Sequence, residues 1–342
     1  MANIRKISEL AGVSVATVSR VLNHPETVSE DTRNRILMVM KELNYVPNSI
    51  ARSLSTNRTS TIGLIIPNIL NPLYPSIAKG VEDVFYKKGY NILLSNTEYD
   101  ASREKDCIEM LLSKKVDGLI ICSSILEIAD FDIIIKQKVP FVLLGEYMED
   151  SDINIVYTDY QLGAYMATTH LIKAGYKTIA HISGPMNRKA SVEKLDGYKK
   201  ALLEAGCKYD EEYIIEGNNQ IDGGHLALKK ILKKKGKPDA IFVANDLMAL
   251  GAIEAVKVSG YTVPGDIAVV GFDDIEVASL VEPKLTTVTH PVYRMGLTAA
   301  RLLLDNILNE EEDCFKQKIF IQPMLKVRKS CGYDNRIEEI FS

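Results

Sequence analysis

The sequence predicts two kinds of structure in one chain: a small all-α headpiece, and an α/β core of two doubly wound lobes. Three observations lead to this prediction. The first 46 residues contain three short segments with helical periodicity. Beyond residue 60, short apolar runs alternate with helical patterns, which is typical of βαβ units. The alternation restarts near residue 158, which favours two sheets over one large sheet.

The headpiece begins with two short helices joined by a tight turn. The first helix is predicted at residues 3–11 from apolar side chains at helical spacing, namely Ile4, Ile7, Leu10 and Ala11. Gly12 allows the chain to turn after this helix. Ser14 is a suitable N-cap for the second helix, because its hydroxyl can accept a hydrogen bond from a free amide.

The second helix has two faces of different character. Val18, Val21 and Leu22 fall on one side of it. The opposite side is small, polar and cationic, with Val15, Ala16, Ser19 and Arg20. Such a helix pair is typical of the helix-turn-helix, whose second helix enters the DNA major groove. An ordinary helical hairpin with a solvated face would show the same periodicity.

A third helix and a linker complete this region. Ser29 is the predicted N-cap of a helix over 30–43, whose apolar stripe would cover the first two helices: Ile36, Val39, Met40 and Leu43. Asn44 is a suitable end for it, and Pro47 follows. Residues 48–54 could form two helical turns, but so short a helix is marginal alone, and a flexible linker is the alternative.

Length and composition exclude several classes of protein. The chain has 342 residues, 46% of them hydrophobic, but no apolar run approaches the ~20 residues that span a bilayer. No apolar secretory stretch follows the N-terminus. The five cysteines are scattered, and they show no metal-ligand spacing with the histidines, including His170, His181, His225 and His290. We therefore expect a cytoplasmic protein without cofactor, metal or membrane partner. Association with the nucleoid would follow if the headpiece binds DNA.

The charge is unevenly distributed along the chain. The net charge of −4 alone argues against nucleic-acid binding. However, residues 1–60 hold 8 Lys/Arg against 5 Asp/Glu, whereas the remainder holds 33 against 40. A modestly basic module on an acidic body suits local contact with DNA phosphates without indiscriminate binding.

The core contains apolar runs of the kind found in strands that are buried on both faces. The first set is predicted near 62–66, 91–94, 118–121 and 141–144. The second set is predicted near 178–182, 213–215, 240–243 and 267–270. A late strand pair is predicted around 319–321 and 325–327, after a helix over 293–308.

The headpiece resembles that of the lactose-repressor (LacI/GalR) family of bacterial transcription regulators. The motifs that carry the resemblance are I-x-x-I-S-E-L-A-G-V-S-V-A-T-V-S-R-V-L-N, V-S-E-D-T-R-N-R-I and L-N-Y-V-P-N-S-I-A-R-S-L. The resemblance continues along the core, which in this family is similar to periplasmic sugar-binding proteins and crosses between its lobes three times. It implies a headpiece at 1–46, a hinge at 47–59, an effector-binding and dimerisation core at 60–335 and a tail at 336–342. Within the core, it places the N-lobe at about 60–157 plus 289–317, and the C-lobe at about 158–288 plus 318–335.

The resemblance implies roles in DNA binding for ten residues: Ser14, Val15, Ala16, Thr17, Ser19, Arg20, Asn23, Asn48, Ala51 and Leu54. Val15 and Ala16 would face base edges. Arg20 would read guanine, with a phosphate contact as the rival role. Thr17, Ser19 and Asn23 would hold phosphates. Leu54 of the hinge helix would enter the minor groove as a wedge and open a base step.

Polar residues near strand ends predict a ligand site, because open α/β sheets bind ligands at the carboxyl ends of their strands. With the resemblance, six residues are expected to contact the effector: Asn71, Leu73, Tyr74, Arg188, Asn245 and Asp273. Strand-end Asn and Asp can instead cap the next helix, and Arg188 can lie on the surface. Three residues depart from common family patterns: Gly145, Val192 and Asn219. These departures argue against the usual galactoside or purine effectors.

These observations together favour a dimeric regulator, most simply a repressor, that binds a pseudo-palindromic double-stranded operator. Its operator affinity would be controlled by a small molecule, a sugar or sugar derivative, acting as inducer or co-repressor. The tail is too short for the apolar heptads of a tetramer, which favours a homodimer. The alternatives are a free-standing cytoplasmic sugar-binding receptor, or a regulator whose co-effector is a partner protein. No motif of an enzyme is found, so we expect no catalytic residue.

Overall fold

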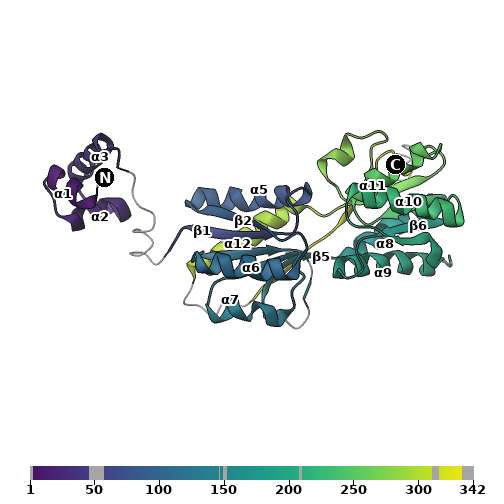
Figure 1. Ribbon diagram of the computed structural model, residues 1–342, viewed down its shortest axis with the longest axis horizontal. Helices are drawn as coiled ribbons and strands as arrows, with labels where there is room; N and C mark the ends of the chain where they lie inside the picture. The colour runs from purple at the N-terminus through teal and green to yellow at the C-terminus, as the bar shows by residue number, and fades with distance from the viewer. Residues whose placement is uncertain are drawn as a thin grey trace, which may run out of the picture. The chain divides into compact units, whose positions relative to one another are not determined.

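The computed structural model describes residues 3–45, 58–145, 147–148, 152–207, 210–309 and 316–332 (Figure 1). The chain separates into two compact units. The first consists chiefly of the headpiece, and the second contains both lobes of the core. The hinge residues Asn48, Ala51 and Leu54, like the tail 336–342, lie outside the described residues.

The headpiece is a three-helix unit formed by α1 (Ile4–Ala11), α2 (Val15–Asn23) and α3 (Glu30–Glu42), with the short helix η1 (Pro25–Thr27) between the last two. Gly12 ends α1 with a φ of 63°, a left-handed conformation in which glycine carries no Cβ penalty. The Ser14 side chain begins α2 by accepting a hydrogen bond from the Thr17 amide at 3.0 Å. Both local predictions are confirmed.

The end of α3 is also as predicted, but its start differs in detail. Asn44 adopts a φ of 47°, and the Tyr45 amide donates to the Met40 carbonyl at 2.9 Å, as in a Schellman motif. Ser29 occupies the N-cap position without capping a backbone amide. Its hydroxyl donates instead to Oγ1 of Thr32 at 2.9 Å.

The apolar faces of the three helices meet in one small core. Its fully buried members include Ile7 from α1, Val18 from α2 and Ile36 from α3. Leu10, one of the apolar residues whose spacing predicted α1, is 54% exposed. Successive helix positions are about 100° apart, so Leu10 points away from its buried neighbour Ala11.

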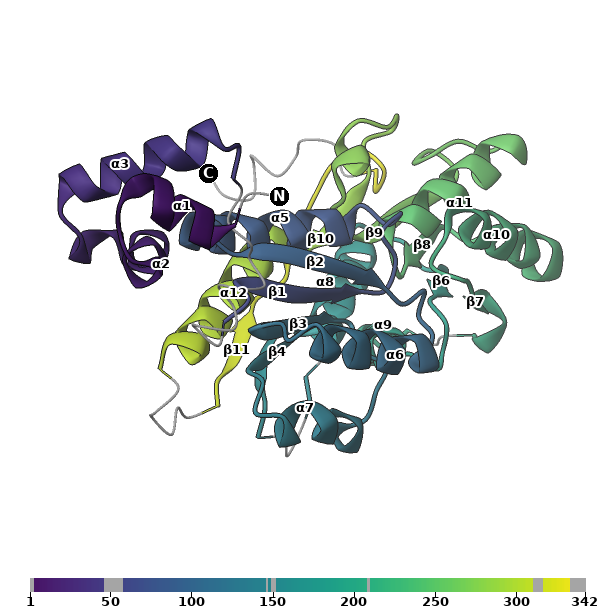
Figure 2. The same cartoon turned by 60° about the vertical axis from the view of Figure 1, so that its left-hand side comes forward.

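The first lobe of the core is built on a six-stranded sheet in the order β11-β5-β4-β3-β1-β2. The strands are β1 (Thr61–Ile66), β2 (Asn91–Asn96), β3 (Gly118–Cys122), β4 (Phe141–Gly145), β5 (Asn154–Thr158) and β11 (Lys318–Ile321). The helices are α5 (Leu73–Phe85), η2 (Tyr86–Lys88), α6 (Ala101–Ser113), η3 (Ile128–Phe131), α7 (Asp132–Lys136) and α12 (Val292–Leu308). Figures 1 and 2 show α5 and α6 on opposite faces of the sheet.

The second lobe repeats this plan with the strand order β12-β10-β9-β8-β6-β7, most of which can be followed by label in Figure 2. Its strands are β6 (Ile179–Ser183), β7 (Ile214–Glu216), β8 (Ala240–Val243), β9 (Ala268–Asp273), β10 (Thr286–Thr289) and β12 (Met324–Lys326). Its helices are α8 (Tyr160–Lys173), α9 (Lys189–Glu204), η4 (Glu211–Tyr213), α10 (Ile221–Lys235), α11 (Asp246–Val258) and η5 (Glu276–Ser279). Among the strand pairs of this sheet in the described part of the chain, only β10 and β12 pair antiparallel.

The chain passes between the lobes after β5, after β10 and after β11. The expected pairing of the last two strands is wrong: β11 pairs with β5 and β12 with β10. The expected lobe division at 317/318 is therefore also wrong, because 318–321 belong to the first lobe. The physical reason is side-chain packing, since Ile319 contacts the first-lobe core and Leu325 contacts a second-lobe core.

Close helix packing, mediated by glycines, fixes the helices that carry the strand-end loops. A Cβ at Gly197 of α9 would lie 2.2 Å from the Gln161 carbonyl of α8. In the first lobe, a Cβ at Gly296 of α12 would lie 2.4 Å from the Ile77 carbonyl of α5. Among the described residues, no helix is long and apolar enough to span a bilayer.

Candidate nucleic-acid interface and ligand cavity

The α2 helix presents the face that the sequence predicted for DNA contact. Val18 is fully buried, whereas Val15 is 41% exposed and both Ala16 and Arg20 are exposed. Arg20 makes no ion pair with any described residue. An exposed cation beside small side chains leaves room for the edges of bases.

The remaining predicted DNA-contacting residues of the headpiece are placed as follows. Thr17 and Ser19 are half-buried on α2, and Ser14 is exposed at its start. The Ser14 hydroxyl already caps the helix and lies 2.9 Å from Oγ1 of Thr17, so both hydroxyls have a structural role. Asn23 is the last residue of α2, and its side chain lies outside the described structure.

A polar cavity lies between the two lobes, within the second compact unit. All six residues predicted to contact an effector line it: Asn71, Leu73, Tyr74, Arg188, Asn245 and Asp273. The carboxyl ends of strands supply many of the lining groups, as expected for parallel sheets. Nine further residues complete the lining: Tyr99, Ser123, Tyr160, Ala190, Ser191, Lys194, Asn219, Ala244 and His290.

The carboxylate of Asp273 lies at the end of β9 and is 8% exposed. No described residue donates a hydrogen bond to it, and Nδ1 of His290 lies 3.9 Å from its Oδ1. Burial raises the pKa of Asp273 from its usual 3.8 to about 6, although the charge of Lys194 acts in the opposite direction. Burial also lowers the pKa of His290 to about 3, so this imidazole is neutral at pH 7. Asp273 thus presents an acceptor that still requires donors.

Arg188 links the two lobes. It precedes α9 of the second lobe, and its Nη2 donates to the Ser123 carbonyl of the first lobe at 2.8 Å. Its guanidinium carbon lies 5.0 Å from the ring centroid of Tyr99. The side chain is 9% exposed, and its Nη1 has no hydrogen-bond partner among the described residues. A surface role for Arg188 does not fit this burial.

Lys194 is the cavity residue that the sequence reasoning missed most clearly. It is 7% exposed, and its Nζ donates to the Ala244 carbonyl at 2.8 Å. The ammonium lies 3.8 Å from the ring centroid of Phe272 and 5.1 Å from that of Tyr160. Its position in the middle of a charged helix gave no sign of burial, because aromatic rings from elsewhere in the lobe create this environment.

Asn245 is the N-cap of α11, so the alternative role of a helix cap is found for it, whereas Asn71 lies one residue before Pro72, the N-cap of α5. Oδ1 of Asn245 accepts from the Met248 amide at 2.8 Å, and its Nδ2 donates to the Asn219 carbonyl at 3.1 Å. Oδ1 of Asn71 accepts from the Leu73 amide at 3.1 Å. These bonds orient both side chains and use part of their capacity, since an amide has two donors and two acceptor sites.

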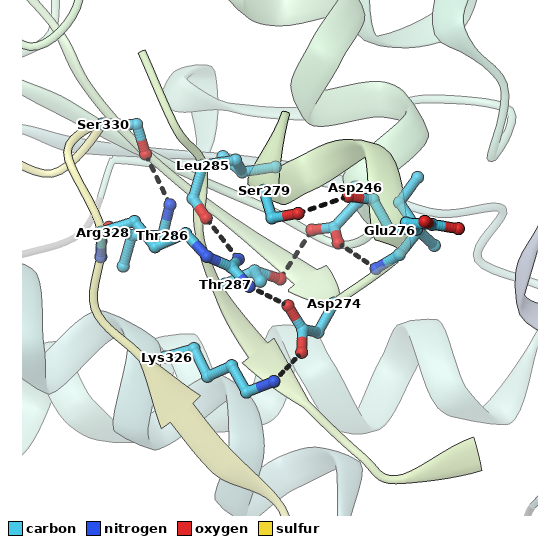
Figure 3. A network of polar contacts seen from close by, with 11 residues as sticks. Asp246, Asp274, Glu276, Ser279, Leu285, Thr286, Thr287, Lys326, Arg328 and Ser330 are labelled. Atoms are coloured by element: carbon cyan, nitrogen blue, oxygen red, sulfur yellow. Dashed lines mark hydrogen bonds and ion pairs between the residues drawn. The ribbon is translucent and has the colours of Figure 1, made fainter. Parts of the chain in front are cut away.

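A network of hydrogen bonds and ion pairs surrounds Asp274, the residue after Asp273 (Figure 3). Asp273 and Asp274 both have positive φ values, 114° and 59°. The Asp274 carboxylate accepts from Nη2 of Arg328 at 2.5 Å and from Nζ of Lys326 at 2.6 Å. Lys326 is the last residue of β12, and Arg328 follows it by two residues. Both lie immediately after the third passage of the chain between the lobes. The loop that carries Asp273 is therefore tied to an interlobe segment.

A buried aspartate on α11 holds the same loop from its other side. The Asp246 carboxylate is fully buried, and it accepts from the Thr287 hydroxyl at 2.6 Å and from the Ile275 amide at 3.0 Å (Figure 3). Burial raises its pKa well above the usual value. No group of His, Cys, Asp and Glu among the described residues is arranged to hold a metal ion.

A helix-turn-helix unit followed by two doubly wound lobes around a polar cavity defines a ligand-responsive DNA-binding regulator. Two family models match the chain. "Periplasmic binding proteins and sugar binding domain of LacI family" matches residues 59–328, and "Bacterial regulatory proteins, lacI family" matches residues 3–48. The chain belongs to the LacI family of bacterial regulatory proteins. It is a transcriptional repressor with a ligand-binding domain, and not an enzyme.

Relatives and solved structures agree with this assignment. The HTH-type transcriptional repressor PurR of Vibrio atlanticus (strain LGP32) is 38% identical over 314 residues, which cover 92% of this chain and 94% of the relative. Catabolite control protein A of Priestia megaterium is 38% identical over 311 residues, 91% and 94% of the two chains. The lac repressor dimer bound to operator and the anti-inducer ONPF has a TM-score of 0.86 at 29% identity, covering 96% and 99%. The transcriptional regulator CelR–cellobiose complex has a TM-score of 0.72 at 34% identity, covering 96% and 100%.

Proposed function

We propose that this repressor acts as a homodimer on a pseudo-palindromic operator, and that a small polyhydroxylated effector in the interlobe cavity controls its operator affinity. One observation carries the effector part of this proposal: a buried carboxylate and a buried guanidinium, Asp273 and Arg188, both line the cavity with unused hydrogen-bonding capacity. Buried polar groups are normally satisfied, so a ligand that supplies both donors and acceptors fits them. Vicinal hydroxyls have this property.

The position of the cavity suggests how a ligand could act at a distance. Arg188 already bonds across the lobes to the Ser123 carbonyl. A ligand held by both lobes would favour one relative arrangement of them over another, and so shift a pre-existing equilibrium. The hinge at 47–59 would transmit this change to the headpieces. Induction and co-repression both follow from the same scheme, with opposite signs.

Exposed apolar side chains support dimerisation through the second lobe. Ile221 of α10, Val258 of α11 and Leu280, which follows η5, are 52%, 61% and 74% exposed. Nζ of Lys257 on α11 donates to the Glu282 carbonyl at 2.7 Å, which holds α11 beside the segment that carries Leu280. Exposed apolar groups that lie near one another, as on α11 and the segment after η5, are typical of an interface. The lac repressor structure similar to this chain is a dimer.

Leu280→Asp is therefore expected to weaken the dimer by about 10- to 100-fold, because it would bury a carboxylate without a partner. Sedimentation equilibrium of the full chain measures this change. Leu203→Asp is the matched control, since Leu203 is 61% exposed on α9, a different helix of the same lobe. Equal dimer constants for Leu280→Asp and the wild type would place the interface elsewhere.

Arg20→Ala is expected to cost about 1–3 kcal/mol of operator binding at particular base positions, if the guanidinium bonds guanine O6 and N7. Binding to a set of operators with single base changes measures this effect. A uniform loss across all sequences, with a shallower salt dependence, would show a phosphate contact instead. Arg33→Ala is the control, because Arg33 lies on α3 and is paired with Glu30 at 3.9 Å.

The function as a whole is tested by selecting operator sequences from a random pool of double-stranded DNA with the full chain. The selected sites should be pseudo-palindromic. Ligands that raise the melting temperature of the protein would then be added to operator-binding assays. A ligand that binds in the cavity without changing operator affinity in either direction would contradict effector control. Selected sites without two-fold symmetry would contradict the dimer.

A further inference from the structure

The cavity holds more positive than negative charge. The lining contains two cations that are nine-tenths buried, Arg188 and Lys194, and one carboxylate, Asp273. From this we infer that the effector carries one anionic group, a carboxylate or phosphate on a polyhydroxylated skeleton, which binds at Arg188 while its hydroxyls bind Asp273. This inference rests on the proposed function, because it describes the ligand of the same cavity.

The positive charge of Lys194 and the negative charge of Asp273 offset each other, which leaves the positive charge of Arg188 without a counter-charge. The charge of Lys194 acts on Asp273, while Arg188 forms no ion pair within 4 Å with any described residue. The partner that Arg188 does have, the Ser123 carbonyl, is neutral. Burying a charge without an opposite charge is costly, so an anionic ligand would relieve a cost that a neutral sugar would leave in place.

Other ionisable groups near the site do not supply the missing negative charge. Burial keeps His290 neutral, since its pKa is lowered to about 3, and it raises the pKa values of Tyr74 and Tyr99, which also stay neutral. Glu104 is buried in the first lobe but does not line the cavity. Its carboxylate accepts from the Ser124 hydroxyl and from the Ile125 amide at 3.2 Å.

The geometry around Arg188 prepares one nitrogen for an oxyanion. Its Nη2 is held by the Ser123 carbonyl, and its guanidinium carbon lies 5.0 Å from the ring centroid of Tyr99, a cation–π contact. Nη1 is buried and has no hydrogen-bond partner among the described residues. A planar guanidinium with a fixed orientation binds carboxylate and phosphate oxygens well. The ligand charge would thus bind beside the bond that joins the two lobes.

Matched ligands test the charge directly. The melting temperature of the full chain would be measured with sugar families that differ only in one group: glucose, glucuronate and glucose 6-phosphate, the corresponding galactose series, and a wider set of sugar acids and sugar phosphates. At least one anionic member should bind at least about 100-fold more tightly than its neutral parent. Comparing the affinities for uronates and for sugar phosphates shows which of the two anionic groups the cavity prefers. Acetate and inorganic phosphate alone should bind much more weakly, because they lack hydroxyls for Asp273.

Variants of Arg188 test whether this residue binds the anionic group. Arg188→Met should lower affinity for the anionic ligand by about 30-fold or more, and should lower the preference over the neutral parent by a similar factor. Arg188→Lys keeps the charge and should retain part of that preference, which separates a ligand contact from a folding defect. Arg301→Met, at an exposed arginine of α12, is the control. A panel in which neutral sugars bind as well as their anionic counterparts, or in which no anionic sugar binds, would overturn the inference.

The two proposals fail in different ways. A neutral effector that changes operator affinity would overturn the anionic ligand but leave effector control standing. An anionic sugar that needs Arg188 but does not change operator affinity would support the ligand class and contradict effector control.

Discussion

Asp273→Asn is expected to lower effector affinity by about 10- to 100-fold, since hydrogen bonds to charged groups contribute roughly 1.5–3 kcal/mol. The variant keeps the size of the side chain and removes its charge. The carboxylate is 8% exposed and accepts no hydrogen bond from any described residue, so little else depends on it. Titration calorimetry with the identified effector measures the change. An affinity within about threefold of the wild type would remove Asp273 from the ligand contacts.

Asp273 is also expected to make the stability of the protein depend on pH. Burial raises the pKa of Asp273 from 3.8 to about 6. In the absence of ligand, the folded carboxyl therefore keeps its proton between these values, while the unfolded one loses it. Its contribution to stability is fully present below pH 3.8 and is lost as the pH rises through about 6. The stability of wild type relative to Asp273→Asn should fall over that range.

Effector binding should depend on pH in the opposite sense, because the ligand hydroxyls need the ionised carboxylate. Affinity should fall as the pH drops through about 6, and Asp273→Asn should lose this dependence. The charged or titratable groups that interact with Asp273 are Lys194 of α9, His290 after β10, Asp246 of α11 and Tyr99 of the first lobe. His290 has a pKa of about 3 and stays neutral over this range. An identical pH profile in the variant would assign the titration to another group.

Asp274→Asn is expected to have the second large effect, on both stability and effector binding. The side chain of Asp274 is 9% exposed and pairs with Arg328, which is 17% exposed, and Lys326, which is 51% exposed. Removing one partner of a buried pair typically costs 3–5 kcal/mol, and the exposure of Lys326 reduces this to about 2–3 kcal/mol. Denaturant unfolding measures the loss.

The effect on binding follows from the backbone. Asp273 and Asp274 have φ values that L-residues rarely adopt, and the ion pairs of Asp274 offset that strain. When they are lost, the loop can relax and withdraw the Asp273 carboxylate from the cavity. We expect about a tenfold lower effector affinity. Lys326→Met is the control, with a loss of at most about 1 kcal/mol, because its ammonium is half exposed. Unchanged effector affinity in a destabilised Asp274→Asn variant would show that the ion pairs of Asp274 contribute to stability alone.

The sequence indicated the headpiece most completely, because its signals are local. Ser14 caps α2 through an amide three residues away, and Gly12 and Asn44 end helices with their own backbone conformation. The buried and exposed faces of α2 follow from helical spacing alone. Leu10 marks the limit of that reasoning, because α1 buries a narrower face than its apolar residues suggest.

The cavity was predicted in part. Asn245 and Asp273 could be located because the carboxyl ends of parallel strands meet at one edge of a sheet. Lys194 and His290 were not predicted to line it, since their burial depends on residues distant in sequence, such as Phe272 and Tyr160. Asn219 was noted only as a departure from the family pattern, yet it lines the cavity.

The sequence by itself determined the two kinds of domain, the βαβ repeat and the exposed face of α2, because each depends on periodicity and on residues close along the chain. Only the tertiary structure decided which sheet takes β11 and which takes β12, since that choice depends on the separate cores that receive Ile319 and Leu325. It also decided that Arg188 reaches Ser123 across the lobes and that its charge lacks a partner. The charge balance of a buried cavity is a property of groups brought together by folding, and no local pattern contains it.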